Sequence, residues 1–428
     1  MTDTTVDHGA DSGSDSEDAD FASDRQQATT LGGAARAYLE RVRGGDMGSL
    51  PAIMGLVVLF VVFGLANDRF LSALNMANLI TQAGAIMVLA MGLVMVLLLG
   101  DIDLSAGVAG GVSACVMGLL IVKQDQPWYL AVLAALVTGA AIGFVIGVLV
   151  AKLGIPSFVV TLAFFLGLQG VTLKLIGQGG SVRVSDPVIS GISRDNLSVL
   201  AGWLLAGVII VGYAAISLLS HRRKVAKNLQ HQPLAVVLLQ IGALAAVLLV
   251  VTYILNINRA PNPGFVIEGI PYVLPVVIVL LIFWTFILSR TSYGRHVYAV
   301  GGNPEAARRA GINVDRIRIS VFMMASSMAA LSGVIAASNS GKVSTSSGGG
   351  NVLLYAVGAA VIGGTSLFGG KGRASDAVIG GLVIATIANG LGLLNQASYI
   401  NFLVTGGVLL LAASVDAVSR RRRSASGV

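Results

Sequence analysis

Residues 70–100 read FLSALNMANLITQAGAIMVLAMGLVMVLLLG, with no charged side chain between Arg69 and Asp101. A transmembrane helix needs about 20 mostly apolar residues to cross the hydrocarbon core of a bilayer. Similar runs fill most of the chain after residue 46, and 55% of all residues are hydrophobic while only 11% are charged. This composition excludes a soluble globular enzyme and a disordered chain. The sequence therefore predicts an all-α fold, a polytopic helical bundle that is integral to a membrane.

Charged residues and polar breaks divide the apolar runs into twelve candidate spans. The candidates are 47–67, 70–100, 104–122, 126–151, 153–173, 196–220, 228–258, 269–289, 319–341, 352–370 and two spans within 377–415. Polar residues at 395–401 separate the last two. The apolar part of the tenth candidate, 352–364, is short for a crossing, so we expect about 10–12 transmembrane helices.

The distribution of basic residues predicts the orientation of the bundle. If the N-terminus is cytoplasmic and all twelve candidates cross, 21 Lys and Arg residues lie in cytoplasmic segments and six lie outside. Cytoplasmic loops of membrane proteins carry such an excess of Lys and Arg. We therefore expect a multi-pass protein of the plasma membrane with both termini in the cytoplasm.

Charge also divides the chain into three parts. Residues 1–24 contain eight acidic residues and no Lys or Arg, and they lack the apolar segment of a signal peptide. We interpret 1–46 as an acidic, disordered cytoplasmic tail with a juxtamembrane segment. Residues 47–418 form the predicted transmembrane domain, and 419–428 form a basic cytoplasmic tail. The other basic residues are spread over short loops, so membrane lipid is an expected partner and nucleic acid is not.

Signatures of an enzyme are almost absent from the sequence. The four histidines are scattered, and none is paired with carboxylates at a metal-binding spacing. The only candidate for a phosphate-binding loop is 364–372, where Gly372 replaces the Ser or Thr that should follow Lys371. We therefore expect no catalytic residue, no metal site and no nucleotide or other cofactor bound by this chain.

Ion-coupled carriers need ionisable residues deep within their spans, because these residues bind the coupling ion. The spans here are almost free of charge, and Asp101 and Asp103 stand at a helix boundary. We expect Asp103 to cap a helix that begins at Leu104, where a carboxylate accepts hydrogen bonds from free backbone N–H groups. An ion- or proton-coupled secondary carrier therefore remains the weaker alternative.

The loop 290–318 carries the clearest local signal. Asn303 is a good N-cap, Pro304 suits the first helical position, and Glu305 complements the helix dipole. Alanines continue this short helix, and Gly311 can end it. The segment is either a solvated surface helix or a rigid knob that docks a soluble partner.

These residues resemble a known family. The stretch from Gly294 to Val314 is similar to the coupling loop of bacterial ATP-binding cassette (ABC) importer permeases, and its first half is similar to the monosaccharide branch of the ribose/branched-chain amino-acid permease family. The resemblance assigns an ATPase-coupling role to Gly294, Arg295, Gly301, Gly302, Asn303, Pro304, Glu305, Ala306, Ala307, Arg308, Arg309 and Gly311.

Two further motifs extend the resemblance to residues 51–416. The first is Gly-Asp-Ile-Asp-Leu-Ser at 100–105, which includes Asp103 and Ser105, and the second is the glycine-rich stretch 363–372. The family-motif glycines of the second stretch are Gly363, Gly364, Gly369 and Gly370. An additional basic hairpin at 203–253 resembles the longer xylose-type permeases. The family usually has glycine where Asp101 stands, so the resemblance assigns no role to this carboxylate.

The resemblance implies a type II-like ABC-importer permease fold and a division of labour. A separate ATPase subunit would bind ATP and Mg and pull on residues 304–310, and an extracytoplasmic sugar-binding protein would deliver the substrate. A second permease copy, in a homodimer, would complete the pathway. The expected substrate is a monosaccharide, with a xylose-type pentose preferred, and a permease of the same family for amino acids or nucleosides is the alternative.

Neutral polar residues within or beside the spans are candidates for the translocation path, because they can hydrogen-bond sugar hydroxyls transiently. These residues are Gln82, Gln169, Asn351, Asn389, Asn395 and Gln396. Hydrogen bonding between helices is the alternative role for each of them.

Overall fold

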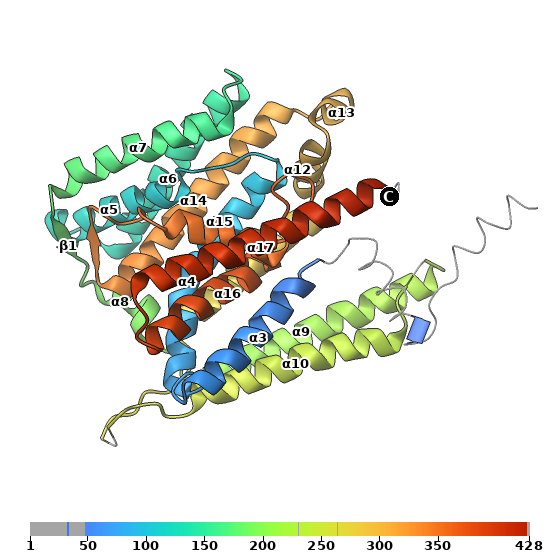
Figure 1. The fold of residues 1–428 in the computed structure, drawn as a ribbon, viewed down its shortest axis with the longest axis horizontal. Helices are drawn as coiled ribbons and strands as arrows, with labels where there is room; N and C mark the ends of the chain where they lie inside the picture. The colour runs from blue at the N-terminus through green and yellow to red at the C-terminus, as the bar shows by residue number, and fades with distance from the viewer. Residues whose placement is uncertain (1–31, 34–47, 230, 263, 426–428) are drawn as a thin grey trace, which may run out of the picture. The chain divides into compact units, whose positions relative to one another are not determined.

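The computed structural model describes residues 32–33, 48–229, 231–262 and 264–425 (Figure 1). The predicted acidic tail therefore lies almost wholly outside the described residues. The chain divides into two compact units, the larger of which contains residues 44–204 and 251–428. The smaller unit includes residues 205–250.

The larger unit is almost entirely helical. Its first half contains α3 (Leu50–Ala66), α4 (Ala73–Leu98), α5 (Ala106–Gln124), α6 (Trp128–Ala151), α7 (Ser157–Ile176), β1 (Ser181–Arg183) and α8 (Pro187–Arg194). Its second half contains α11 (Val273–Arg290), α12 (Ser292–Gly302), α13 (Pro304–Arg309), α14 (Val314–Ser340), β2 (Lys342–Ser344), α15 (Val352–Gly363), α16 (Ala374–Leu393) and α17 (Ser398–Ala425). The polar break that was expected near 395–401 separates α16 from α17.

The smaller unit takes in most of two further apolar helices, α9 (Val199–Ala226) and α10 (Leu234–Asn256). They correspond to the additional hairpin expected at 203–253. Exposed apolar side chains such as Val208 and Leu239 lie along both helices, and Arg222, Arg223 and Lys224 stand near the end of α9. No acidic residue occurs between 196 and 258. A surface that is apolar on its sides and basic at its tip is typical of a membrane hairpin.

Nine helices among the described residues are long and apolar enough to span a membrane, namely α4, α5, α6, α7, α9, α10, α11, α14 and α16. Three shorter apolar helices, α3, α15 and the first part of α17, accompany them. These observations confirm the predicted polytopic helical bundle. The α15 helix has 12 residues. At about 1.5 Å per residue it reaches about 18 Å, which is too short to cross the hydrocarbon core alone.

The core of the larger unit forms around α4 and α14. The α14 helix packs against α4, α5 and α6, while α4 also packs against α15 and α16 (Figure 1). A glycine stripe on α6 permits the close contact with α14: a Cβ atom at Gly139 would lie 2.5 Å from the Ser326 carbonyl oxygen, and one at Gly143 would lie 2.3 Å from that of Phe322. Small residues allow such backbone approach in membrane helices.

Different structural elements lie at the two ends of the larger unit. We call one the coupling end, which consists of residues 98–105, 290–318 and 364–373. At the opposite end, β1 pairs antiparallel with β2, so that Val182 faces Val343, and α8 packs against α14. We call this the strand end. The sequence predicted neither the short strands nor α8, because three-residue strands carry too little periodicity to detect.

Candidate functional site

The coupling end begins with α12, a helix that local sequence signals did not predict. The Thr291 hydroxyl caps it by accepting a hydrogen bond from the Gly294 N–H at 3.2 Å. Val297 and Val300 are buried, whereas Arg295 is exposed, so one face of α12 packs against the bundle and the other faces outward. The Tyr298 hydroxyl donates to the Gly372 carbonyl at 2.7 Å and fastens α12 to the α15–α16 loop.

The next helix, α13, confirms the capping prediction. The Asn303 Oδ1 atom accepts a hydrogen bond from the Ala306 N–H at 2.9 Å, and Pro304 occupies the first helical position. At the other end, Gly311 has φ +83°, its N–H donates to Arg308, and the Ile312 N–H donates to Ala307. This pair of bonds is the Schellman motif, which satisfies the last free carbonyls of a helix. The six-residue helix is therefore closed at both ends.

Most of α13 faces outward. Ala307 is buried at 4% exposure, whereas Glu305, Ala306, Arg308 and Arg309 are exposed. Glu305 and Arg308 form an ion pair at 3.2 Å with side chains 71% and 56% exposed. Such exposed pairs contribute little to stability. The helix is held by its caps and flanks and presents a small, charged outer surface.

Four glycines lie close together at the coupling end, and we call them the glycine junction: Gly100, Gly301, Gly369 and Gly370. A Cβ atom at Gly301 would lie 1.8 Å from the Leu98 carbonyl oxygen, which also accepts a hydrogen bond from the Gly370 N–H at 2.8 Å. A Cβ atom at Gly369 would lie 2.8 Å from the Gly301 carbonyl oxygen. The end of α12, directly before α13, therefore contacts both the end of α4 and the glycine-rich stretch 363–372. A Cβ atom at Gly369 would also lie 3.0 Å from the Gly100 nitrogen, so the two motifs meet, which the sequence did not predict.

At the motif 100–105, the structure corrects the predicted start of the helix that follows Asp103. The α5 helix begins at Ala106 with Ser105 as its N-cap, so it starts two residues later than expected. Asp103 still serves this terminus, because its Oδ1 accepts hydrogen bonds from the Ser105 N–H at 2.8 Å and the Ser105 hydroxyl at 2.6 Å. Burial raises the pKa of the Asp101 and Asp103 carboxyl groups above their usual values. For Asp101, the nearby Arg318 guanidinium opposes this rise in pKa. For Asp103, the hydrogen bonds from Ser105 oppose it.

Gly363 and Gly364 stand at the end of α15, where the chain packs closely against the start of α16. A Cβ atom at Gly363 would lie 1.9 Å from the Asp376 carbonyl oxygen, and Gly364 ends α15 with φ +119°. The Asp376 carboxylate accepts hydrogen bonds from the Arg373 N–H at 2.8 Å and the Thr365 hydroxyl at 3.1 Å. Sequence reasoning missed Asp376, although an acidic residue in the first turn of a helix is a recognisable signal.

The candidate path residues separate into two groups. Asn389 and Asn75 are buried on α16 and α4 and exchange reciprocal hydrogen bonds at 2.8 and 3.0 Å, and Asn389 also donates to the Gln82 Oε1 at 3.3 Å. Asn75 was not among the predicted residues. This geometry is that of hydrogen bonding between helices.

The other four path candidates do not join this cluster. Gln169 is half-buried on α7, and Asn351 precedes α15 without a side-chain cap. Asn395 and Gln396 are exposed in the turn between α16 and α17. Within the described part of the chain, no group of three or more His, Cys, Asp or Glu residues could hold a metal ion.

Comparison with known proteins connects this geometry to a family. The model of the family described as "Branched-chain amino acid transport system / permease component" matches residues 75–413. The xylose transport system permease protein XylH of Haemophilus influenzae is 33% identical over 371 residues, which cover 86% of this chain and 96% of that protein. XylH of Escherichia coli K12 is 32% identical over 372 residues, covering 86% and 92%.

Other similar proteins are named for the import of a different sugar, ribose. The ribose import permease protein RbsC of Escherichia coli K12 is 32% identical over 369 residues, covering 85% of this chain and 92% of that protein. No solved structure matches the chain significantly. The residues that the family model matches include the glycine junction, α12, α13, α14 and nearly all of α4. This chain is therefore a polytopic membrane protein that belongs to the permease family of branched-chain amino acid transport systems.

Proposed function

We propose that this chain is the membrane-spanning subunit of an ABC importer for a monosaccharide, and that its substrate is a pentose of the xylose type. The observation that carries the proposal is the similarity to a xylose transport permease over 86% of the chain, at 33% identity. The similarity to a ribose import permease supports the wider class of monosaccharides.

The proposal assigns ATP and Mg²⁺ to a separate ATPase subunit, because the sequence contains no complete phosphate-binding loop. That subunit docks on α13. The support is geometric: the helix is capped at both ends, buries only Ala307 deeply and exposes Glu305, Arg308 and Arg309. The two arginines are placed to pair with acidic residues of the ATPase, which would add modest affinity if the pairs stay exposed.

Movement of α13 reaches the bundle through the glycine junction. Gly301 lies against the end of α4, and Gly370 hydrogen-bonds the same carbonyl of Leu98 from the α15–α16 loop. Contacts this close leave little room for sliding, so a shift of α12 and α13 displaces α4 and α16 as rigid bodies. The transport cycle alternates the access of the pathway by this displacement.

The proposal also covers the orientation of the chain and its remaining partners. The basic residues near the coupling end support its placement on the cytoplasmic side, with both termini in the cytoplasm. The strand end then faces outward, where an extracytoplasmic sugar-binding protein delivers the substrate. A second copy of the chain completes the pathway in a homodimer.

Reconstitution in liposomes tests this function. The complex of this chain with its ATPase and its binding protein should import radiolabelled D-xylose only when ATP is supplied. Excess D-ribose should compete, and excess leucine should not. Competition by leucine alone would instead favour an amino-acid permease. Uptake that needs no ATPase and collapses with a protonophore would show a secondary carrier.

The coupling loop has its own test in the same system. Glu305→Ala should weaken ATPase docking and lower uptake, because Glu305 stands in the exposed first turn of α13. If docking and uptake are both unchanged, α13 is not the coupling element.

A further inference from the structure

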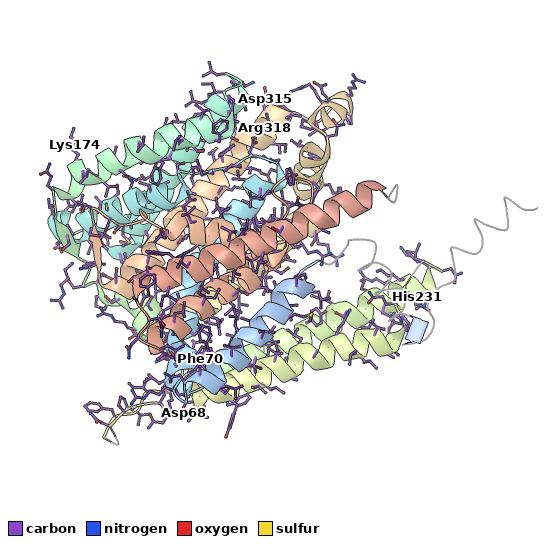
Figure 2. All side chains as sticks on the ribbon, in the orientation of Figure 1. Asp68, Phe70, Lys174, His231, Asp315 and Arg318 are labelled. Atoms are coloured by element: carbon purple, nitrogen blue, oxygen red, sulfur yellow. The ribbon has the colours of Figure 1, made fainter. Side chains whose placement is uncertain are left out.

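Asp101 and Arg318 form an ion pair at the coupling end. The Arg318 Nε atom lies 3.3 Å from the Asp101 Oδ2 atom, and the two side chains are 28% and 11% exposed. The described residues contain two other ion pairs, and both are more exposed. Figure 2 labels Arg318 in the first turns of α14, together with Asp315. The pair therefore joins the α4–α5 loop to the helix that follows α13.

The α4–α5 loop is held from other sides as well. The Ile102 N–H donates to the Ser157 hydroxyl at 3.2 Å, and the Thr161 hydroxyl donates to the Ile102 carbonyl at 3.3 Å. Both partners belong to α7. The loop thus has a fixed position on the bundle, and Asp101 presents its charge from a rigid support.

The two flanks of α13 rest on the same short segment of chain. On the upstream flank, Gly301 contacts the Leu98 carbonyl. On the downstream flank, Arg318 contacts Asp101. Segment 98–101 therefore supports both flanks of α13, although about 200 residues separate it from α13 in the sequence. A force on α13 reaches this segment through both flanks.

The chemistry of the pair suits a positional role better than a stabilising one. Removing two charges from water offsets most of their attraction, so a buried ion pair adds little net stability. Neither the Asp101 Oδ2 nor the Arg318 Nε atom makes a hydrogen bond. A charge contact does, however, specify one partner and one position, whereas apolar contacts tolerate sliding.

We propose that Asp101 and Arg318 form a positioning pair that keeps the start of α14 in register with the α4–α5 loop, so that movement of α13 is converted into opening of the pathway. This inference rests on the proposed function. It assigns a role to Asp101, for which the family resemblance provided none. The pair does not contact substrate or nucleotide and acts through α13 and α4.

The test measures coupling in the complete reconstituted complex, as D-xylose imported per ATP hydrolysed. Asp101→Asn and Arg318→Gln should each lower this ratio by about threefold to tenfold, the range expected for residues that carry coupling between sites. The double variant should be no worse than either single variant, because the pair is already broken. Arg318→Lys, which keeps the charge, should retain at least half of the wild-type ratio. A merely structural role would lower protein yield and leave the ratio unchanged.

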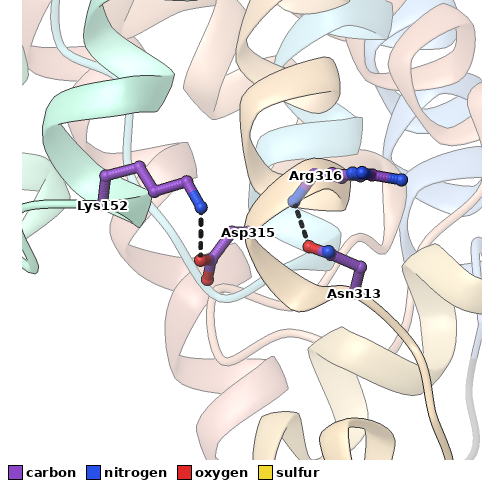
Figure 3. Close-up of polar contacts among 4 residues, drawn as sticks. All are labelled: Lys152, Asn313, Asp315 and Arg316. Atoms are coloured by element: carbon purple, nitrogen blue, oxygen red, sulfur yellow. Dashed lines mark hydrogen bonds and ion pairs between the residues drawn. The ribbon is translucent and has the colours of Figure 1, made fainter.

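Lys152 and Asp315 provide the matched control. They form an ion pair at 3.2 Å between the end of α6 and the first turn of the same α14 helix (Figure 3), but their side chains are 59% and 34% exposed. Lys152→Gln and Asp315→Asn should keep the wild-type ratio, because exposed pairs contribute little.

The outcomes separate the two proposals. If the wild-type complex imports no pentose with ATP, the proposed function fails. If it does so and the Asp101→Asn and Arg318→Gln complexes keep its ratio, or their losses add in the double variant, the positioning pair fails. Should a single variant not assemble because it buries an unpaired charge, the neutral double variant decides: a wild-type ratio overturns the pair, and a lowered ratio supports it.

Discussion

The Gly370 N–H donates a hydrogen bond to the Leu98 carbonyl at 2.8 Å, which ties the loop between α15 and α16 to the end of α4. The two residues are far apart in the sequence: Leu98 stands two residues before the motif at 100–105, and Gly370 belongs to the glycine-rich stretch 363–372. Gly301, at the end of α12, packs on the same carbonyl. One oxygen atom is therefore the point at which the coupling loop and the glycine-rich stretch 363–372 both meet the end of α4.

The first prediction concerns this contact. Gly301→Ala would place a Cβ atom 1.8 Å from the Leu98 oxygen, so the end of α12 must move. We expect a loss of about 1–3 kcal/mol in stability, typical of overpacking, and a strong fall in ATP-driven uptake. Gly170→Ala, on α7, is the control, because a Cβ atom there has no neighbour within 4 Å. Thermal unfolding and uptake measure both effects, and equal behaviour of the two variants would contradict the junction.

The second prediction concerns the cap of α13. Asn303→Ala removes the acceptor of the Ala306 N–H and should cost about 1 kcal/mol of helix stability. Hydrogen exchange at 304–310 should therefore become faster, and less ATPase should copurify. Asn303→Asp should behave like the wild type, since Asp also caps and adds favourable charge.

A second cap in the same loop serves as the control. Asn313 accepts from the Arg316 N–H at 3.0 Å at the start of α14 (Figure 3). Asn313→Ala should leave exchange at 304–310 unchanged, because α14 is a long helix held by packing. Faster exchange at 304–310 in this variant alone would show that α13 depends on α14 and not on its own cap.

The third prediction separates structural from path residues. Asn389→Ala leaves the buried Asn75 amide without its reciprocal partner and should lower stability by about 1–3 kcal/mol. The double variant Asn75→Ala/Asn389→Ala should lose less than the sum of the single losses, since one interaction is removed twice. Gln396→Ala, at an exposed site, should have the stability of the wild type. A changed KM for D-xylose in Asn389→Ala at unchanged stability would instead place Asn389 in the path.

The fourth prediction concerns the contact between α6 and α14. A Cβ atom at Gly143 would lie 2.3 Å from the Phe322 carbonyl oxygen, so Gly143→Ala should force the helices apart and destabilise the bundle by about 1–3 kcal/mol. Gly167, on α7, has no neighbour within 4 Å of a Cβ atom. Gly167→Ala should be neutral, or stabilising by about 0.5–1 kcal/mol through helix propensity. The order of the two melting temperatures checks this prediction.

Sequence and structure agree where the signal is local. The uncharged run at 70–100 predicted a membrane helix, and the described helix α4 lies within it. The order Asn303, Pro304 and Gly311 predicted both ends of α13, because capping is decided by residues within one turn of the helix end. The prediction was less accurate at Asp103: the helix was expected to begin at Leu104, but α5 begins at Ala106. The reason is that an aspartate can accept hydrogen bonds at a helix terminus from more than one position.

By itself, the sequence determined that this chain is a helical membrane protein, where its main helices lie, and that a short capped helix stands in a basic loop. Hydropathy and capping are short-range properties, so they can be read along the chain. Only the tertiary structure decided which distant segments share a position. Leu98, Gly301 and Gly370 meet, Asp101 faces Arg318, and Asn75 pairs with Asn389, because helix packing selects among many possible neighbours. No local pattern encodes that selection, since it depends on the fit of whole helix surfaces.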